Sequence, residues 1–230
     1  MSDVLKDSVY FGVMISLLAY GIGMLLQKKF KLAVLNPLLI SVIFVIVVIK
    51  CGHIEYDRYY EGAKYISYLL TPATVCLAIP LYEQFELLKH NWKAVVLGIV
   101  AGVLASLACV LAMAAIFRLD HQEYVTLLPK SITTAIGMGV SEEMGGYVTI
   151  TVAVIIITGI LGNIMGEFMC RLFKVEEPVA KGVALGTCSH AIGTSKAMEM
   201  GEIEGAMSSL AIAVAGLLTV GGASVFAYFY

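Results

Sequence analysis

The sequence predicts an all-α polytopic membrane protein with about seven to eight transmembrane segments, some of them broken or re-entrant, of the secondary-transporter type with inverted repeats. The first observation behind this prediction is composition: 60% of the residues are hydrophobic and 14% are charged, against about 25% charged in soluble domains. The second is that apolar residues form blocks of about 14 to 25, a length that crosses a bilayer. The third is that polar, glycine and proline residues interrupt some of these blocks.

The first two apolar blocks predict two membrane helices. Val9 to Leu26 is too long for the core of a signal peptide, and lysines follow it rather than a small-residue cleavage site. Asn36-Pro37 opens a second helix over Leu38 to Ile49, because proline in the first turn loses no hydrogen bond. We expect a polar loop from Cys51 to Lys64.

The third apolar block, Tyr65 to Tyr82, is predicted to be broken, because Pro72 and Pro80 each remove a backbone donor. A surface connection over Glu83 to Lys93 leads to a long uninterrupted helix over Ala94 to Phe117. Small residues at near four-residue spacing on this helix favour close helix packing. They are Gly98, Gly102 and Ala105.

The second half of the chain alternates interrupted and continuous segments. Polar and glycine residues interrupt Glu123 to Tyr147, so we expect a broken or re-entrant element there. Tyr147 to Phe173 is predicted to be a long helix whose polar side chains, Asn163 and Glu167, face protein rather than lipid. Val179 to Met200 is expected to be discontinuous, and a last helix follows over about Gly205 to Tyr230.

Basic residues in short loops predict the orientation. The lysines at 28, 29 and 31 place the first loop in the cytoplasm and the amino terminus outside, which also puts the loop with Lys89 and Lys93 inside. If Glu123 to Tyr147 enters and leaves on one side, the loop with Arg171 and Lys174 is inside as well. A full crossing would place that loop outside.

We interpret residues 1–230 as a single membrane domain with two candidate repeats, 1–117 and 123–230. Each opens with a proline near a helix start, Pro37 or Pro129, and each later carries a broken segment, Thr71 to Pro80 or Gly186 to Lys196. Paired interruptions are typical of transporter repeats around a site at the membrane midplane. Chance similarity between apolar sequences is the alternative.

The richest polar string is Gly186 to Lys196. Unwound backbone at membrane depth must line water or be buried in protein, and a half-helix restarting near Gly193 would direct free N–H groups at an anion such as a carboxylate. His190 can exchange a proton near neutral pH, and a structural role is its alternative. Hydroxyl groups in the same string come from Thr187, Ser189, Thr194 and Ser195.

A second string, Pro129 to Thr134, puts Lys130 inside an apolar segment. Inserting a lysine there costs about 2.5–3.5 kcal/mol, so a partner is expected. An anionic substrate is one candidate, and snorkelling to the interface is an alternative, as is pairing with an acidic residue. The acidic candidates are Glu142, Glu143 and Glu167.

Other classes of function have little support. The net charge is −2 without a basic stripe, so no nucleic-acid binding is expected. No GxSxG elbow or phosphate-binding glycine loop occurs, so we expect no enzymatic activity and no cofactor. The five cysteines contain no CxxC pair and are interpreted as packing residues. The acidic group Glu199, Glu202 and Glu204 is interpreted as a solvated helix end rather than a metal site.

Seven strings of residues, distributed over nearly the whole chain, closely resemble those of the LrgB/CidB family of bacterial membrane proteins. One departure is Ala135, where many relatives have proline, which predicts a milder helix break there. The matching strings are Tyr59-Tyr60-Glu61-Gly62-Ala63, Pro72-Ala73-Thr74-Val75, Pro80-Leu81-Tyr82, Pro129-Lys130-Ser131 with Thr133-Thr134, Gly186-Thr187, Ser189-His190-Ala191-Ile192-Gly193-Thr194 and Glu199-Met200-Gly201-Glu202.

The resemblance implies two functions in the bacterial cytoplasmic (inner) membrane. One is antiholin-like or holin-like control of murein hydrolase export and autolysis, beside a small membrane partner of the LrgA/CidA type. The other is transport of small carboxylates such as pyruvate, as in a plant relative that looks like a plastidial glycolate/glycerate translocator. A holin needs little more than apolar helices that oligomerise, whereas Lys130 and His190 in broken helices fit a substrate site.

We therefore predict a secondary transporter of small monocarboxylates that forms a homodimer in the lipid bilayer, with the antiholin-like regulator as the alternative. The residues predicted to couple transport to protons are His190 and Glu167. No metal site is predicted. The residues predicted to bind the substrate are Thr71, Thr74, Lys130, Ser131, Thr133, Thr134, Thr187, Ser189, His190, Gly193, Thr194 and Ser195.

Overall fold

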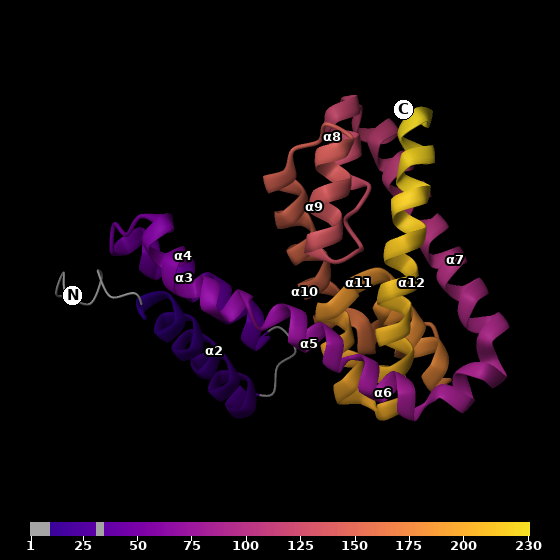
Figure 1. The fold of residues 1–230 in the computed structure, drawn as a ribbon, viewed down its shortest axis with the longest axis horizontal. Helices are drawn as coiled ribbons and strands as arrows, with labels where there is room; N and C mark the ends of the chain where they lie inside the picture. Colours follow the sequence, from indigo (N-terminus) through magenta and orange to yellow (C-terminus); the bar gives the residue numbers. More distant parts are fainter. Residues whose placement is uncertain (1–9, 31–34) are drawn as a thin grey trace. The chain divides into compact units, whose positions relative to one another are not determined.

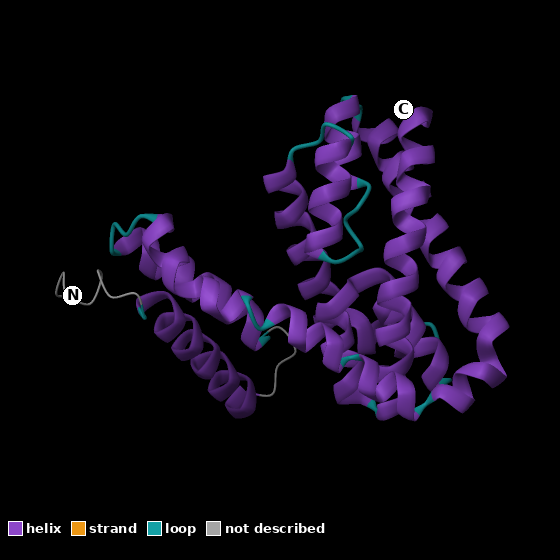
Figure 2. Ribbon diagram, in the orientation of Figure 1, coloured by secondary structure: helices purple, strands orange, loops and turns teal. Residues whose placement is uncertain are grey.

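The computed structural model describes residues 10–30 and 35–230, and every regular element in these ranges is a helix (Figures 1 and 2). The side chains of Leu70, Thr71 and Thr74 lie outside the described part. The chain divides into two compact units, which join between Cys76 and Leu77. The predicted all-α class is confirmed.

The helices of the first unit pack closely at glycines. The unit contains α2 (Phe11–Phe30), α3 (Pro37–Cys51), α4 (Tyr56–Ser67) and α5 (Leu70–Cys76). Gly12 of α2 lies so close to the backbone of Tyr59 that a Cβ would overlap it, and the Ser16 and Tyr59 hydroxyls are 2.9 Å apart. The predicted loop from Cys51 to Lys64 is therefore wrong in its second part, because these residues form a helix that packs on α2.

Three prolines stand in the first turn of helices in the first half of the chain. Pro37 begins α3, where Asn36 Oδ1 accepts a hydrogen bond of 2.8 Å from Leu38 N. Pro72 and Pro80 are each the third residue of a short helix, α5 and α6 (Ala78–Glu83). The predicted interruption of this region is confirmed, but the breaks precede the prolines, because the first N–H groups of a helix have no partner within it.

The second unit is built around α7 (Phe85–Phe117), which begins upstream of the predicted start at Ala94. One face of α7 is buried at four-residue spacing against α11 and α12, which is the pattern of a helix facing a protein core. The buried side chains of this face include Val95, Ile99, Val103 and Leu107.

A hairpin of two short helices follows α7. α8 (His121–Leu127) begins with a capping box, in which Asp120 Oδ1 accepts from Glu123 N at 2.7 Å. α9 (Thr134–Glu143) returns to the base of α8, where Gln122 Nε2 donates to Gly145 O at 2.9 Å. Both ends of the hairpin therefore lie at one side of the membrane, as predicted for a re-entrant element, and residues 128–133 form its tip.

A second hairpin is formed within α11 (Pro178–Met200), after α10 (Val148–Leu172). His190 interrupts it with φ 44° and ψ −140°. Lys181 of the first arm and Lys196 of the second line the same cavity at the end of α10, so both arms share one base. The predicted discontinuity of this segment is confirmed.

The two hairpins enter the second unit from opposite ends (Figure 1). α7 ends where the first hairpin begins, α10 starts where that hairpin ends, and the second hairpin starts at the far end of α10. α12 (Glu202–Phe226) then runs back, and Tyr124 Oη of α8 donates to Phe226 O at 2.9 Å. The short 3₁₀ helix η1 (Ala227–Phe229) follows it.

Four described helices, α2, α7, α10 and α12, are long and apolar enough to cross a membrane, and α3 is a shorter apolar helix. Because the first hairpin enters and leaves on one side, Arg171 and Lys174 share a side with Lys89 and Lys93, as the predicted orientation requires. A spanning helix followed by a hairpin occurs twice, with opposite direction. The boundaries of this repeated arrangement differ from those of the predicted repeats, 1–117 and 123–230. The predicted repeats stay a prediction.

Candidate functional site

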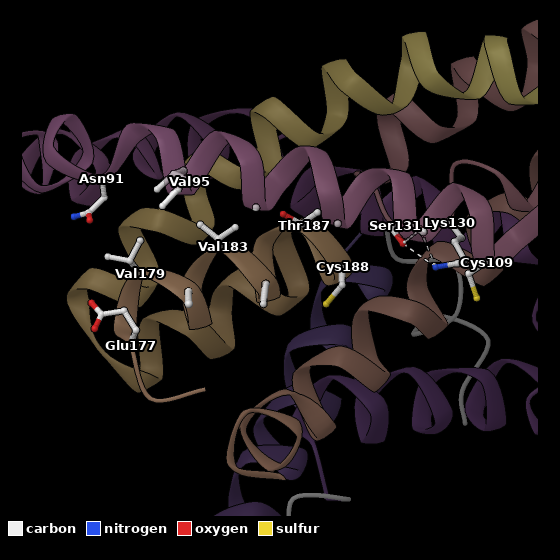
Figure 3. A pocket seen from close by; sticks show the side chains of 16 residues that line it. Asn91, Val95, Cys109, Lys130, Ser131, Glu177, Val179, Val183, Thr187 and Cys188 are labelled. Carbon is white, nitrogen blue, oxygen red and sulfur yellow. Dashed lines mark hydrogen bonds between the residues drawn. The ribbon is translucent and has the colours of Figure 1, made fainter. Parts of the chain in front are cut away.

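A cavity of about 690 Å³ lies in the second unit between α7, the first arm of α11 and the tip of the α8–α9 hairpin. Figure 3 shows Lys130, Ser131 and Cys109 at one end of it, and Asn91 and Glu177 at the other. The walls between the two ends are mainly apolar. They include Val95, Gly98, Gly102, Val179, Val183 and Ala184.

The ammonium group of Lys130 is held by hydroxyl groups. Nζ donates to Ser131 Oγ at 2.9 Å and to Ser106 Oγ at 3.2 Å, and the two hydroxyl oxygens are 3.1 Å apart. Within residues 10–30 and 35–230, no acidic side chain forms an ion pair with Lys130. The positive charge at this end of the cavity is therefore not neutralised by an acidic side chain of these ranges.

Both hairpin tips lie deep in the membrane. Ser106, which accepts from Lys130, precedes the end of α7 by eleven residues, or about 16 Å at 1.5 Å per residue. Thr187 follows the start of α11 by nine residues, or about 14 Å. A bilayer core is about 30 Å thick, so the two tips meet near its middle.

Thr187 brings a polar atom without a partner to the cavity wall. Its side chain is 5% exposed, and Oγ1 has no hydrogen-bond partner in the described chain. The methyl group packs against Gly102 of α7, where a Cβ would lie 2.8 Å from Thr187 Cγ2. A buried hydroxyl without a partner is costly.

The other predicted residues of the second tip lie outside this cavity. His190 is 3% exposed, and because a carbonyl only accepts, its Nε2 donates to Ile155 O of α10, at 3.0 Å. Thr194 Oγ1 bonds His190 O at 3.0 Å and Ser208 Oγ at 2.7 Å. These contacts support the helix break, and a substrate-binding role for either residue stays a prediction.

Ser189, Gly193 and Ser195 also support the second hairpin. Ser189 Oγ is 3.0 Å from Cys188 Sγ. Gly193 lets the two arms approach, because a Cβ there would lie 2.5 Å from the Cβ of Ser189. Ser195 Oγ donates to Ile192 O at 2.8 Å and accepts from Asn163 Nδ2 at 3.1 Å. The prediction that Asn163 faces protein is confirmed.

Two of the four other predicted threonines lie away from the cavity wall, and the side chains of the other two lie outside the described part of the chain. Thr133 is the N-cap of α9, and Thr134 is its first residue. Neither lines the cavity that contains Lys130. Thr71 and Thr74 have side chains outside the described residues, so their predicted role stays a prediction.

Glu167 lies in a second, charged cavity of about 530 Å³ at the base of the α11 hairpin. One of its oxygens is 3.3 Å from Lys196 Nζ, and the other pairs with Arg171. The predicted proton-coupling residues Glu167 and His190 therefore lie at different places, one at the hairpin base and one at its tip. A group of three or more His, Cys, Asp or Glu side chains that could hold a metal ion does not occur among the described residues.

Ser106 and two cavity thiols were not predicted from the sequence. Ser106 continues the spacing of Gly98 and Gly102 by four residues, so its place on the same face of α7 could have been predicted. Cys109 and Cys188 line the cavity and are exposed, which corrects their interpretation as packing residues. No sequence pattern separated them from the other cysteines.

Comparison with known proteins supports the resemblance seen in the sequence. The model of the LrgB-like family matches residues 16–229. Antiholin-like protein LrgB from Bacillus mycoides (strain KBAB4), Bacillus cereus (strain B4264) and Bacillus anthracis (strain CDC 684 / NRRL 3495) is 41% identical over 212 residues, which is 92% of either chain. No solved structure is similar.

Proposed function

Because the chain belongs to the LrgB-like family and is a multi-pass membrane protein, we propose that it is a secondary transporter of small monocarboxylates. The observation that carries this proposal is Lys130, whose ammonium group has two hydroxyl partners and, in the part of the chain that the structure describes, no acidic one. A carboxylate is a natural ligand for such a group, because hydrogen bonds between ionised partners are the strongest ones.

The surroundings of Lys130 fit a transported anion better than a permanent partner. The charge lies near the membrane middle, where an ammonium group is costly, and it faces a cavity rather than a packed acidic side chain. Two hairpins entering from opposite sides meet there, which is the arrangement of transporters with a midplane site. Transport across the bacterial cytoplasmic membrane is the proposed consequence.

Uptake by the purified protein in liposomes tests this function. We expect saturable uptake of radiolabelled pyruvate or glycolate, and loss of most of it in Lys130→Met. The matched control is Lys93→Gln, since Lys93 is an exposed lysine on α7 that does not line the cavity. Uptake that Lys130→Met leaves unchanged would contradict this site, and absence of any uptake would contradict transport.

The second candidate function is antiholin-like regulation of murein hydrolase export and autolysis. Its support is more direct in one respect, because the relatives at 41% identity are themselves named antiholin-like protein LrgB. We propose an LrgA/CidA-type membrane protein as the partner for this role, and a homodimer as the assembly. The cavity with Lys130 has no evident part in it.

Autolysis assays separate the two candidates. In a bacterial host without its own copy, we expect the chain to change the rate of autolysis if the regulatory role holds, and to require the LrgA/CidA-type partner. If Lys130→Met keeps that effect while losing carboxylate uptake, the two functions are separate. If both are lost together, carboxylate movement underlies the regulation.

A further inference from the structure

We propose that the cavity prefers an α-keto or α-hydroxy monocarboxylate with an apolar tail longer than that of a three-carbon acid. Its carboxylate binds at Lys130, and its tail lies along the groove between α7 and the first arm of α11. This inference rests on the proposed transport function and narrows its substrate class.

The size of the cavity is the first argument. Its volume is about 690 Å³, and pockets of about 300–1,000 Å³ enclose drug-sized ligands. The lining runs along α7 from Asn91 to Cys109 and along α11 from Glu177 to Cys188. A three-carbon acid held at Lys130 would leave most of this length unfilled.

The distribution of charge is the second argument. Lys130 is the one cation among the described residues that line the cavity, and Glu177 lies at the opposite end (Figure 3). Between them the walls are valine, alanine and glycine, with Val183 near the middle. A second carboxylate on the ligand would lose its water without finding a cation, so dicarboxylates are disfavoured.

The hydroxyl groups near Lys130 are the third argument. Ser106 and Ser131 both accept from the ammonium group, and one of them donates to the other across 3.1 Å. The proton of the remaining hydroxyl is free to point at a ligand. An oxygen atom on the carbon next to the carboxylate, as in a keto or hydroxy acid, can accept from one of these groups.

A competition experiment tests the substrate class in liposomes that take up labelled pyruvate. The α-keto acid derived from leucine and α-ketoglutarate are similar in size but differ in the second carboxylate. We expect the leucine-derived acid to inhibit pyruvate uptake at least as well as unlabelled pyruvate does. α-Ketoglutarate should need a concentration higher by about tenfold or more, since its second carboxylate stays unpaired.

A variant that fills the groove tests where the tail lies. Ala184 is exposed and lines the cavity, so Ala184→Phe should weaken inhibition by the leucine-derived acid about tenfold more than it weakens inhibition by unlabelled pyruvate. Ala101→Phe is the matched control, because Ala101 is exposed on α7 and does not line the cavity. Ala101→Phe should change neither the inhibition by the leucine-derived acid nor the inhibition by unlabelled pyruvate.

Protection of Cys188 gives a readout independent of transport. Cys188 is exposed to the cavity, so in a variant whose other four cysteines are serine, the leucine-derived acid should slow its reaction with a maleimide. Pyruvate uptake with equal inhibition by the two test acids, or with no protection of Cys188, overturns the inference and leaves transport standing. Absence of uptake and of protection for every acid overturns both.

Discussion

Lys130 combines a cost in stability with the proposed binding function. The ammonium group lies near the membrane middle and has no acidic partner in the described ranges. A lysine at the centre of a membrane helix costs about 2.5–3.5 kcal/mol on insertion scales, a cost that an apolar side chain of similar volume does not carry. A residue of this kind is expected to be retained for its ligand rather than for the fold.

Lys130→Met should therefore raise the stability of the purified protein, by about 1–3 kcal/mol, while it removes most of the carboxylate uptake. Thermal unfolding in detergent measures the first effect. A clear loss of stability would mean that the hydrogen bonds to Ser106 and Ser131 hold the hairpin tip in place, and the loss of uptake would then have a structural cause.

At the scale of helices, α7 and α11 lie very close to each other at Gly102, beside the cavity. A Cβ at this position would lie 2.8 Å from Thr187 Cγ2. Gly102→Ala should therefore destabilise the protein by about 1–3 kcal/mol through overpacking. Adding Thr187→Ser removes the methyl group in question and should restore most of the loss, so the two substitutions should not be additive.

Gly139→Ala is the control for that pair, because Gly139 of α9 has no neighbouring atom within 4 Å of a Cβ. It should be neutral or stabilising, by up to about 1 kcal/mol, since alanine is the better helix residue. Equal losses from Gly102→Ala and Gly139→Ala would show that contact with Thr187 is not the cause.

The sequence predicted the interrupted elements better than the continuous ones. Glycine, proline and polar residues in apolar blocks are strong signals, and both hairpins were found from them. α4 was missed because its tyrosines and charged residues resemble a loop, although contact with Gly12 of α2 holds it as a helix. The start of α7 was placed too late because its first turns are polar.

The site could be predicted only in part, for a reason of geometry. Lys130 and Ser131 belong to one string and Thr187 to another, and the sequence indicated that these strings meet. It could not indicate where His190 points, because a side chain at a helix break follows backbone angles that no periodic pattern contains. Its φ of 44° turns it toward Ile155 instead of the cavity.

For the whole molecule, the path of the second unit predicts which loops share a side of the membrane. α10 separates Glu143 from Glu176, and both side chains are exposed. In a variant whose five cysteines are serine, a membrane-impermeant maleimide added to intact cells should label Glu143→Cys. Glu176→Cys should react only after the membrane is opened, as basic residues on the inner side require. Labelling of both in intact cells would contradict a crossing by α10.

Glu167 allows a test of whether proton binding is coupled to transport by the whole molecule. It pairs with Arg171 of its own helix and with Lys196 of the second hairpin arm, so its charge links α10 to α11. If it carries the coupled proton, Glu167→Gln should keep uptake down a pyruvate gradient but lose its stimulation by an inward proton gradient. Glu199→Gln is the control, because Glu199 also pairs with Lys196 but lies on the same arm.

The break at His190 is surrounded by side chains that replace the hydrogen bonds of the helix. Thr194 Oγ1 bonds the carbonyl of His190 at 3.0 Å, and Asn163 Nδ2 donates to Ile192 O at 2.8 Å. Two carbonyl oxygens at the interruption therefore have side-chain donors in place of backbone ones. His190 is 3% exposed and Thr194 is 1% exposed, so the amide hydrogens at the break should exchange with deuterium much more slowly than those of a frayed helix end.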